Sequence, residues 1–334
     1  MRPPELSRLR TCSDAACSSR AARTPHSRSS SRSPGSRRRI ARVPAVTGGE
    51  RRRCGFTLAE VLVVIAIIAI VVSIALIAIR SARAGASRSA TVSTLRTLTA
   101  AWNAYSLDHR QQLLPGFIDD DIQADLGIAV ALQDGTEVPP AAARTWVWRL
   151  APYADHAWQS FFAEADAAER AALAALYADR DLVEMSRRPS YGLNSIFLGG
   201  DSAAAGLGSL APWNSSGDPS IAAVRATELR NPGTLVLFAP TRRATGPGAP
   251  ETSGWYELRA PYLAERQWEV TAEGVVAASS FAGPTGGIPA ARRGESVLPV
   301  AFADGSASTV AVEELAEDMR RWTPRADTPL WRVP

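Results

Sequence analysis

The longest apolar run of the chain lies between residues 61 and 79. Its sequence, VLVVIAIIAIVVSIALIAI, has 19 residues and is interrupted only by Ser73. An α-helix rises about 1.5 Å per residue, so this run extends for roughly 28 Å, close to the hydrocarbon thickness of a bilayer. The pattern therefore predicts one membrane-spanning helix.

A second pattern follows this run, in which apolar residues recur at spacings of three and four. These residues are Val92, Leu95, Leu98, Trp102 and Tyr105. The polar side of the same stretch carries Arg80, Arg83, Arg88, Arg96 and Asn103. Such spacing is typical of an amphipathic helix, whose apolar face we expect to pack on a sheet. The helix should end near Asp108-His109, before Pro115-Gly116, which makes it roughly fifty residues long.

The remainder of the chain, residues 113–334, mixes helical and strand patterns. We expect an Ala-rich helix, a buried strand and a terminal helix at residues 163–180, 234–239 and 313–322. Asp304-Gly305 suits a two-residue type I′ hairpin turn. The segments 199–217 and 241–254 are rich in Gly and Pro and are predicted surface loops. Together these patterns predict an α+β fold.

Composition separates the first 55 residues from the rest. Residues 1–55 hold 14 arginines against Glu5, Asp14 and Glu50, a net charge of +11, so the whole-chain charge of +4 leaves −7 for the remainder. This Arg-, Ser- and Pro-rich segment lacks the apolar residues needed for a core, and we expect it to be disordered. A nucleic-acid interface would need these charges on a folded surface, so no nucleic-acid partner is expected.

Reactive side chains are scarce beyond this segment. Cys12, Cys17 and Cys54 all precede residue 56, so the folded part has no disulfide and no cysteine metal ligand. Its histidines are His109 and His156, and the spacings typical of zinc proteases, serine hydrolases and P-loops do not occur. We therefore expect no enzyme activity, no metal and no cofactor.

Two other groups of residues invite a binding role, and a plainer interpretation is favoured for each. The acidic triplet Asp119-Asp120-Asp121 lacks the spaced pattern of a calcium loop and is expected to be a solvated turn. The nine tryptophans all lie after residue 100. Their aromatic faces suit sugars and cations, but we expect them mainly in the core.

Charge around the apolar run predicts its orientation. Three arginines at residues 51–53 directly precede it, and basic residues stay on the cytoplasmic side, so the C-terminal domain should face outward. An ordinary membrane anchor or a secretory signal cut after Ala84, in the sequence Ala82-Arg83-Ala84, remains an alternative. Glu60 at the start of the run argues against both, because an unpaired carboxylate entering the membrane is costly.

Residues 55–60, GFTLAE, followed by the apolar run, resemble the N-terminal cleavage and methylation motif of type IV pilins and type II secretion pseudopilins. The resemblance implies that a prepilin peptidase cuts between Gly55 and Phe56 and methylates the amine of Phe56. It also implies a pilin-like fold, a long N-terminal helix packed on an antiparallel sheet domain. Glu60 lies one helical turn below the freed amine, and we expect it to pair with the amine of a neighbouring subunit.

Further segments resemble a pseudopilin-like subfamily that ends in a histidine-x9-Asp-Gly motif. They are STLRTLTAAWNAYSLDHRQQLLPG at 93–116, WVWRLAPY at 146–153, SYGLN at 190–194 and VAFADGS at 300–306. Gly294 occupies the position of the histidine that names this subfamily, with Arg292 and Arg293 before it. Any role of that histidine therefore does not transfer to this chain.

These patterns predict a leader at 1–55, a membrane and filament-packing helix at 56–79, its amphipathic continuation at 80–112 and an exported domain at 113–334. The expected function is a structural subunit of a type II secretion pseudopilus or a type IV pilus-like filament. Expected partners are the prepilin peptidase, other pilin subunits, an inner-membrane assembly platform and lipid. The alternatives are a singly anchored envelope protein with an exterior ligand-binding domain, or a secreted binding protein cut after Ala84.

Overall fold

The computed structural model describes most of the chain after the leader. It covers residues 57–155, 158–162, 167–202, 221–243, 252–271, 276–278, 286–290 and 296–333. Gly55, Phe56, His156 and Gly294 lie outside the described residues. By its internal contacts the chain divides into two units, Met1–Leu62 and Val63–Pro334.

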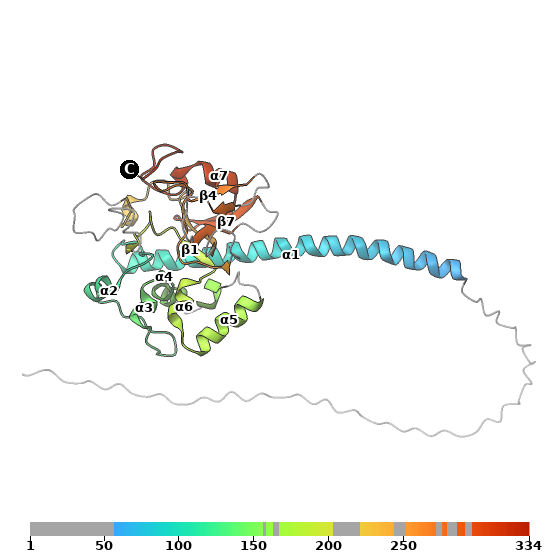
Figure 1. Cartoon of the computed structure of the whole chain (residues 1–334), viewed down its shortest axis with the longest axis horizontal. Coiled ribbons are helices and arrows are strands. Elements are labelled where there is room, and N and C mark those ends of the chain that lie inside the picture. Colours follow the sequence, from blue (N-terminus) through green and yellow to red (C-terminus); the bar gives the residue numbers. More distant parts are fainter. Residues whose placement is uncertain are drawn as a thin grey trace, which may run out of the picture. The chain divides into compact units, whose positions relative to one another are not determined.

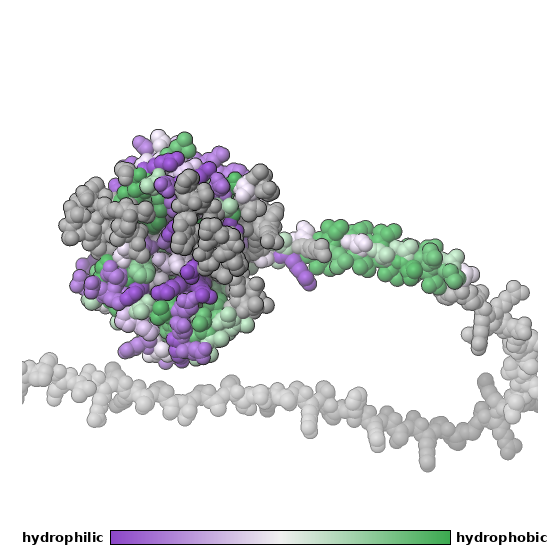
Figure 2. Space-filling model, viewed as in Figure 1, coloured by the Kyte–Doolittle hydropathy of each residue, from purple (hydrophilic) through white to green (hydrophobic). Residues whose placement is uncertain are grey.

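The helix α1, Leu58–Asp108, has 51 residues and crosses the boundary between the units. Every described side chain from residue 61 to residue 79 is exposed, and Figure 2 shows the band of apolar side chains on this part of α1. Later in the helix, Leu95 and Leu98 are fully buried and Trp102 is 1% exposed. The helix ends at Asp108, as predicted, and the chain then turns through left-handed backbone at Arg110 and Gln111. The predicted apolar face of the amphipathic part is therefore confirmed.

A group of short helices follows α1 along the chain. They are α2 Asp120–Leu126, α3 Pro140–Ala143, α4 Trp146–Leu150, η1 Ala151–Ala154, η2 Trp158–Phe162, α5 Ala167–Ala178 and α6 Leu182–Arg187. Asp119 caps α2 by accepting a hydrogen bond from the Ile122 amide, and Gly127 ends it with a φ of 62°. The helix predicted at 163–180 is α5, which ends at Ala178 because the chain turns at Arg180, whose φ is 58°.

The main sheet is antiparallel and has the strand order β1-β2-β7-β8. Its strands are β1 Tyr191–Leu193, β2 Val236–Arg243, β7 Val297–Phe302 and β8 Ala307–Ala311. The short strands β3 Thr252–Ser253 and β6 Gly286–Pro289 pair with the far end of β2, and β4 Trp268–Val270 pairs with β5 Val276–Ala278. The remaining elements are η4 Ala226–Glu228, α7 Val312–Glu317 and η5 Met319–Arg321. This arrangement confirms an α+β fold with a long N-terminal helix.

The sheet is buried on both faces. Leu235 and Leu237 belong to the hydrophobic cluster that includes Leu98 of α1 and the residues of α3, α4 and α6. Val236, between them, belongs to a second cluster with Leu315 of α7 and the C-terminal residues. Figure 1 shows α7, β4 and β7 on one side of α1 and α3, α5 and α6 on the other. Burial on both faces explains why the predicted strand is a continuous apolar run rather than an alternating one.

Two predicted boundaries were wrong. The strand predicted at 234–239 begins at Val236 and continues to Arg243, into the segment predicted as a loop. The Thr241 hydroxyl donates to the Trp255 carbonyl at 2.7 Å and accepts from the Trp255 amide at 3.0 Å, which holds this extension in place. The terminal helix predicted at 313–322 is broken at Asp318, whose carboxylate caps the Arg320 amide and starts the separate turn η5.

The predicted hairpin between β7 and β8 is present, but its turn differs from the type I′ prediction. Gly305 has a φ of 97°, whereas Asp304 is not among the residues with positive φ, and type I′ requires positive φ at both. The Asp304 carboxylate instead accepts hydrogen bonds from the amide and hydroxyl of Ser306, at 2.8 and 2.7 Å. The Phe302 amide bonds to the Ser306 carbonyl, so the loop spans three residues and places glycine at its left-handed position.

The segment SYGLN at 190–194 forms β1 and connects the sheet to the C-terminus. A Cβ atom on Gly192 would lie 2.5 Å from the Glu257 carbonyl oxygen, so the neighbouring chain excludes any side chain there. Asn194 is fully buried, and its amide donates to the carbonyls of Val236 at 2.9 Å and Trp322 at 2.7 Å. Gly192 is therefore explained by the close approach of a neighbouring backbone, and Asn194 by its hydrogen bonds to two backbone carbonyls.

The two faces of α1 offer a test of this packing. Replacing the fully buried Leu98 by alanine should lower the free energy of unfolding by about 2–5 kcal/mol, because it leaves a cavity in the core. The matched change Leu107→Ala, in the same helix at a side chain that is 70% exposed, should cost less than about 0.5 kcal/mol. Urea unfolding of the full chain in detergent micelles, followed by tryptophan fluorescence, measures both. Equal costs would contradict the packing of α1.

Candidate functional site

The described chain begins with a compact set of hydrogen bonds at the N-terminus of α1. Oε2 of Glu60 accepts from the Thr57 backbone amide at 2.8 Å and from the Thr57 hydroxyl at 2.9 Å. In return, the Glu60 amide donates to the Thr57 hydroxyl oxygen at 3.2 Å. The first amides of a helix have no partner within the helix, and this exchange satisfies two of them. The arrangement is a capping box.

Thr57 is the site residue that the sequence analysis did not identify. Its signal is present in the sequence as Thr-x-x-Glu directly before an apolar run, the pattern of a capping box. The predicted role of Glu60 was to pair with an amine of another subunit. In this single chain its carboxylate is held by its own Thr57, while Oε1 accepts no hydrogen bond from the residues that the structure describes. Gly55 and Phe56, the predicted cleavage position, lie directly before the described residues.

The helix that follows is suited to an apolar environment. Helical hydrogen bonds satisfy its backbone, and the Ser73 hydroxyl donates to the Ala69 carbonyl at 2.7 Å. Lipid offers no partner for a free polar group, so this internal pairing is what a membrane requires. By length and composition α1 qualifies to cross a membrane. The sequence Ala82-Arg83-Ala84, the alternative cleavage position, lies within α1.

Two residues of the acidic triplet at 119–121 have structural partners. Nε of Arg144 donates to Asp120 at 2.8 Å, and this pairing holds the pKa of the Asp120 carboxyl below its usual value. Asp119 is the cap of α2. In the part of the chain that the structure describes, no group of three or more His, Cys, Asp or Glu side chains is placed to hold a metal ion. Among the tryptophans, the expected core packing is confirmed for five fully buried ones: Trp102, Trp146, Trp148, Trp268 and Trp322.

Comparison with known proteins concerns the same N-terminal region. Residues 51–76 match the family model described as the prokaryotic N-terminal methylation motif. The match begins at the three arginines, includes the capping box and ends within the apolar run. No curated protein and no solved structure matches the chain. The motif is consistent with a protein of the type IV prepilin or pseudopilin kind, and with the apolar helix it fits a single-pass membrane protein.

The capping box makes a prediction about the first turn of α1. Thr57→Ala removes the hydroxyl oxygen that accepts from the Glu60 amide. Loss of a helix cap costs about 1 kcal/mol, so the Glu60 amide should exchange with deuterium about fivefold faster. The matched control is Thr94→Ala, because the Thr94 hydroxyl donates to the Ala90 carbonyl of the same helix and caps nothing. Hydrogen exchange of the full chain in micelles, read by NMR, measures the rate. An unchanged rate in Thr57→Ala would show that the capping box does not form.

Proposed function

We propose that the chain is a structural subunit of a type II secretion pseudopilus or a type IV pilus-like filament. The observation that carries this proposal is the methylation motif at residues 51–76, placed at the start of a helix whose apolar side chains from residue 61 to residue 79 are exposed. Exposed apolar area of this extent must be covered by lipid or by other chains. A filament of packed helices covers it without lipid.

Processing begins at the cytoplasmic face. The prepilin peptidase cuts between Gly55 and Phe56, removes the basic leader and methylates the amine of Phe56. Glycine presents a backbone without a side chain to this peptidase. The methylated amine keeps its positive charge, so it still needs an anionic partner once it leaves water.

Glu60 supplies that partner during assembly. Before assembly its carboxylate is held at the helix terminus by Thr57, which gives it two hydrogen bonds at the edge of the apolar run. When subunits pack side by side, the carboxylate binds the amine of a neighbour, which neutralises two charges that are costly to leave in an apolar core. Glu60 thus passes from an intrachain cap to an interchain ion pair.

The location follows from the same elements. The mature chain resides in the bacterial inner membrane with its N-terminus toward the cytoplasm and residues 113–334 outside. Its partners are other pilin-like subunits, the peptidase and an inner-membrane assembly platform. A motif devoted to processing and helix packing points to a structural subunit rather than to an enzyme.

The terminal peptide tests the processing step. Mass spectrometry of protein isolated from a membrane fraction should find a mature chain that starts at N-methylated Phe56. Gly55→Leu should leave the leader attached, because a bulky side chain blocks the cut. If the wild-type protein kept its leader, or if its N-terminus were Gly85, the proposal of a pilin-like subunit would be wrong.

Assembly is tested separately by Glu60→Leu. Breaking one partner of a buried ion pair costs about 3–5 kcal/mol, so subunit crosslinking in the membrane should fall by about 100-fold or more. The amount of protein in the membrane should not change, since the apolar run is intact. Glu137→Leu, at an exposed carboxylate outside α1, is the matched control. Undiminished crosslinking would favour a singly anchored envelope protein that uses the motif for targeting alone.

A further inference from the structure

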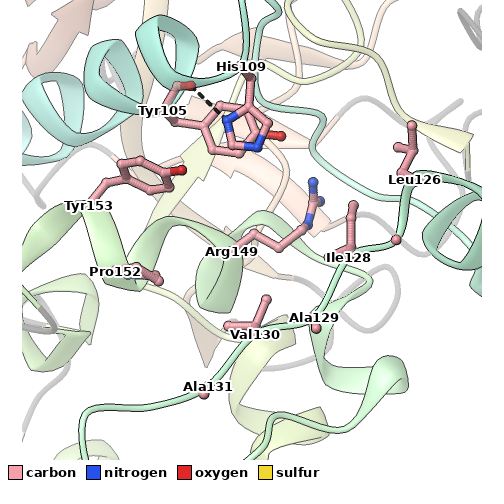
Figure 3. A pocket seen from close by; sticks show the side chains of 11 residues that line it. Tyr105, His109, Leu126, Ile128, Ala129, Val130, Ala131, Arg149, Pro152 and Tyr153 are labelled. Atoms are coloured by element: carbon pink, nitrogen blue, oxygen red, sulfur yellow. Dashed lines mark hydrogen bonds between the residues drawn. The ribbon is translucent and has the colours of Figure 1, made fainter. Parts of the chain in front are cut away.

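The cavity beside the end of α1 contains a charged group whose partners come from the fold itself. Its volume is about 260 Å³, and Figure 3 shows Tyr105, His109, Arg149 and Tyr153 around it. The Arg149 guanidinium donates to five backbone carbonyls. Burial lowers the pKa of Arg149 to about 10, and the nearby Tyr105 hydroxyl and Asp201 carboxylate oppose this shift. This cation is therefore used within the fold, and we assign no ligand to its cavity.

A second cavity, of about 520 Å³, lies where three segments that are far apart in the sequence meet. They are the turn at residues 132–134, the chain at residues 155–159 and the last turn of α5. The described residues that line it include two aromatic rings, two carboxylates and two primary amides, and none of them is basic. Its volume is in the range of sites for small molecules. Filament assembly through α1 gives this cavity no role.

Hydrogen bonds fix two walls of this second cavity. The Leu132 amide donates to the Thr136 carbonyl at 2.8 Å, which closes the turn. Arg180, just after α5, donates to the Thr136 hydroxyl and to the Asp134 carboxylate, both at 3.2 Å. The end of α5 is thereby joined to the turn. The walls are held without a ligand, and a preformed site lowers the cost of binding.

Trp158 gives the cavity an aromatic surface whose position is also fixed. The centroids of its ring and the Tyr177 ring lie 4.4 Å apart, with the planes inclined by 31°. The rings of Trp148 and Phe162 meet it at 62° and 77°. Trp158 is nevertheless partly exposed, and its Nε1 donates to no acceptor among the residues that the structure describes. The side chain therefore offers apolar contact and a hydrogen-bond donor in one place.

Planar polar side chains surround this aromatic surface. Gln133 and Gln159 are exposed, and their amides form no hydrogen bond with the described part of the chain. Asp155 is also exposed, and its left-handed backbone, with a φ of 49°, ends the helix η1. An amide both donates and accepts, as a hydroxyl does, and a carboxylate accepts at two oxygens. This set of groups therefore suits a ligand with several neighbouring hydroxyls.

The charges at the cavity favour a neutral ligand over an organic cation. Asp134 forms an ion pair with Arg180 and so has its counter-charge. The Arg180 guanidinium also lies over the Tyr177 ring, 5.5 Å from its centroid. A cation that entered the cavity would find one carboxylate and one aromatic ring already occupied by this arginine.

We propose that this cavity binds a neutral saccharide. The sugar hydroxyls pair with Gln133, Gln159 and Asp155, and the Trp158 indole donates to a sugar oxygen. The C–H groups of the sugar pack on Leu132 and on the exposed part of the Trp158 ring, whose electron-rich surface attracts them. Packing of the rings against one another explains their positions. It does not explain why amides and a carboxylate gather around the part of Trp158 that this packing leaves exposed.

The test is saturation-transfer NMR of maltose, cellobiose and N,N′-diacetylchitobiose with the full chain in nanodiscs, with empty nanodiscs as the blank. We expect saturable binding of at least one of these neutral disaccharides. Gln159→Ala should weaken it about three- to tenfold, because a hydrogen bond is lost, without a change in the thermal unfolding midpoint. Gln133→Trp should abolish binding by filling the cavity. Gln112→Trp, at an exposed glutamine that does not line this cavity, should leave it unchanged.

Absence of binding of all three disaccharides up to about 10 mM would overturn the proposal. Binding that survives Gln133→Trp would overturn it too, because the sugar would then bind elsewhere. Displacement of the sugar by tetramethylammonium chloride, at a concentration where sodium chloride has no effect, would show that the cavity selects a cation instead. None of these results depends on filament assembly.

Discussion

The apolar surface of α1 between residues 61 and 79 is the constraint on which the rest of the molecule depends. The same continuous helix also contains a buried face, which is formed by Leu95, Leu98 and Trp102. A helix satisfies its own backbone hydrogen bonds, so the same element serves in lipid, in a filament and in a protein core. Gly85 is its only glycine and it has no proline, which lets the helix run unbroken for 51 residues.

The domain that packs around the second half of α1 must be stable without disulfide bonds, because all cysteines precede residue 56. Its sheet achieves this by burying both faces, one against α1 and the short helices and the other against α7 and the C-terminal residues. Buried polar groups are used to connect these layers. Asn194 joins β2 to the C-terminus, and Arg149 joins α4 to the chain after α1. Each forms several hydrogen bonds, as burial of a polar group demands.

Two chemically different sites emerge at the two ends of α1. At its start, Thr57 and Glu60 form a polar cluster at the edge of an apolar run, where we propose that charge neutralisation governs assembly. Near its end, Tyr105 and the adjacent His109 form the wall of a cavity that contains a buried cation. The first site is proposed to act between subunits. A single helix thus carries the methylation motif at one end and helps to line a cavity at the other.

The sequence pattern alone determined the apolar run, the end of the long helix at Asp108, the buried face of its second part and the α+β class. These follow from periodicity and local chemistry, which act over a few residues. It also contained the Thr-x-x-Glu signal, although Thr57 was identified only in the structure. The extension of β2 to Arg243 was decided by tertiary contacts of Thr241 with Trp255. The hairpin turn type and the break at Asp318 rest on side-chain hydrogen bonds of Asp304 and Asp318, which became visible only in the structure. The cavity likewise joins residues 105, 109, 128 and 149, which no local pattern brings together, because only packing determines which distant side chains meet.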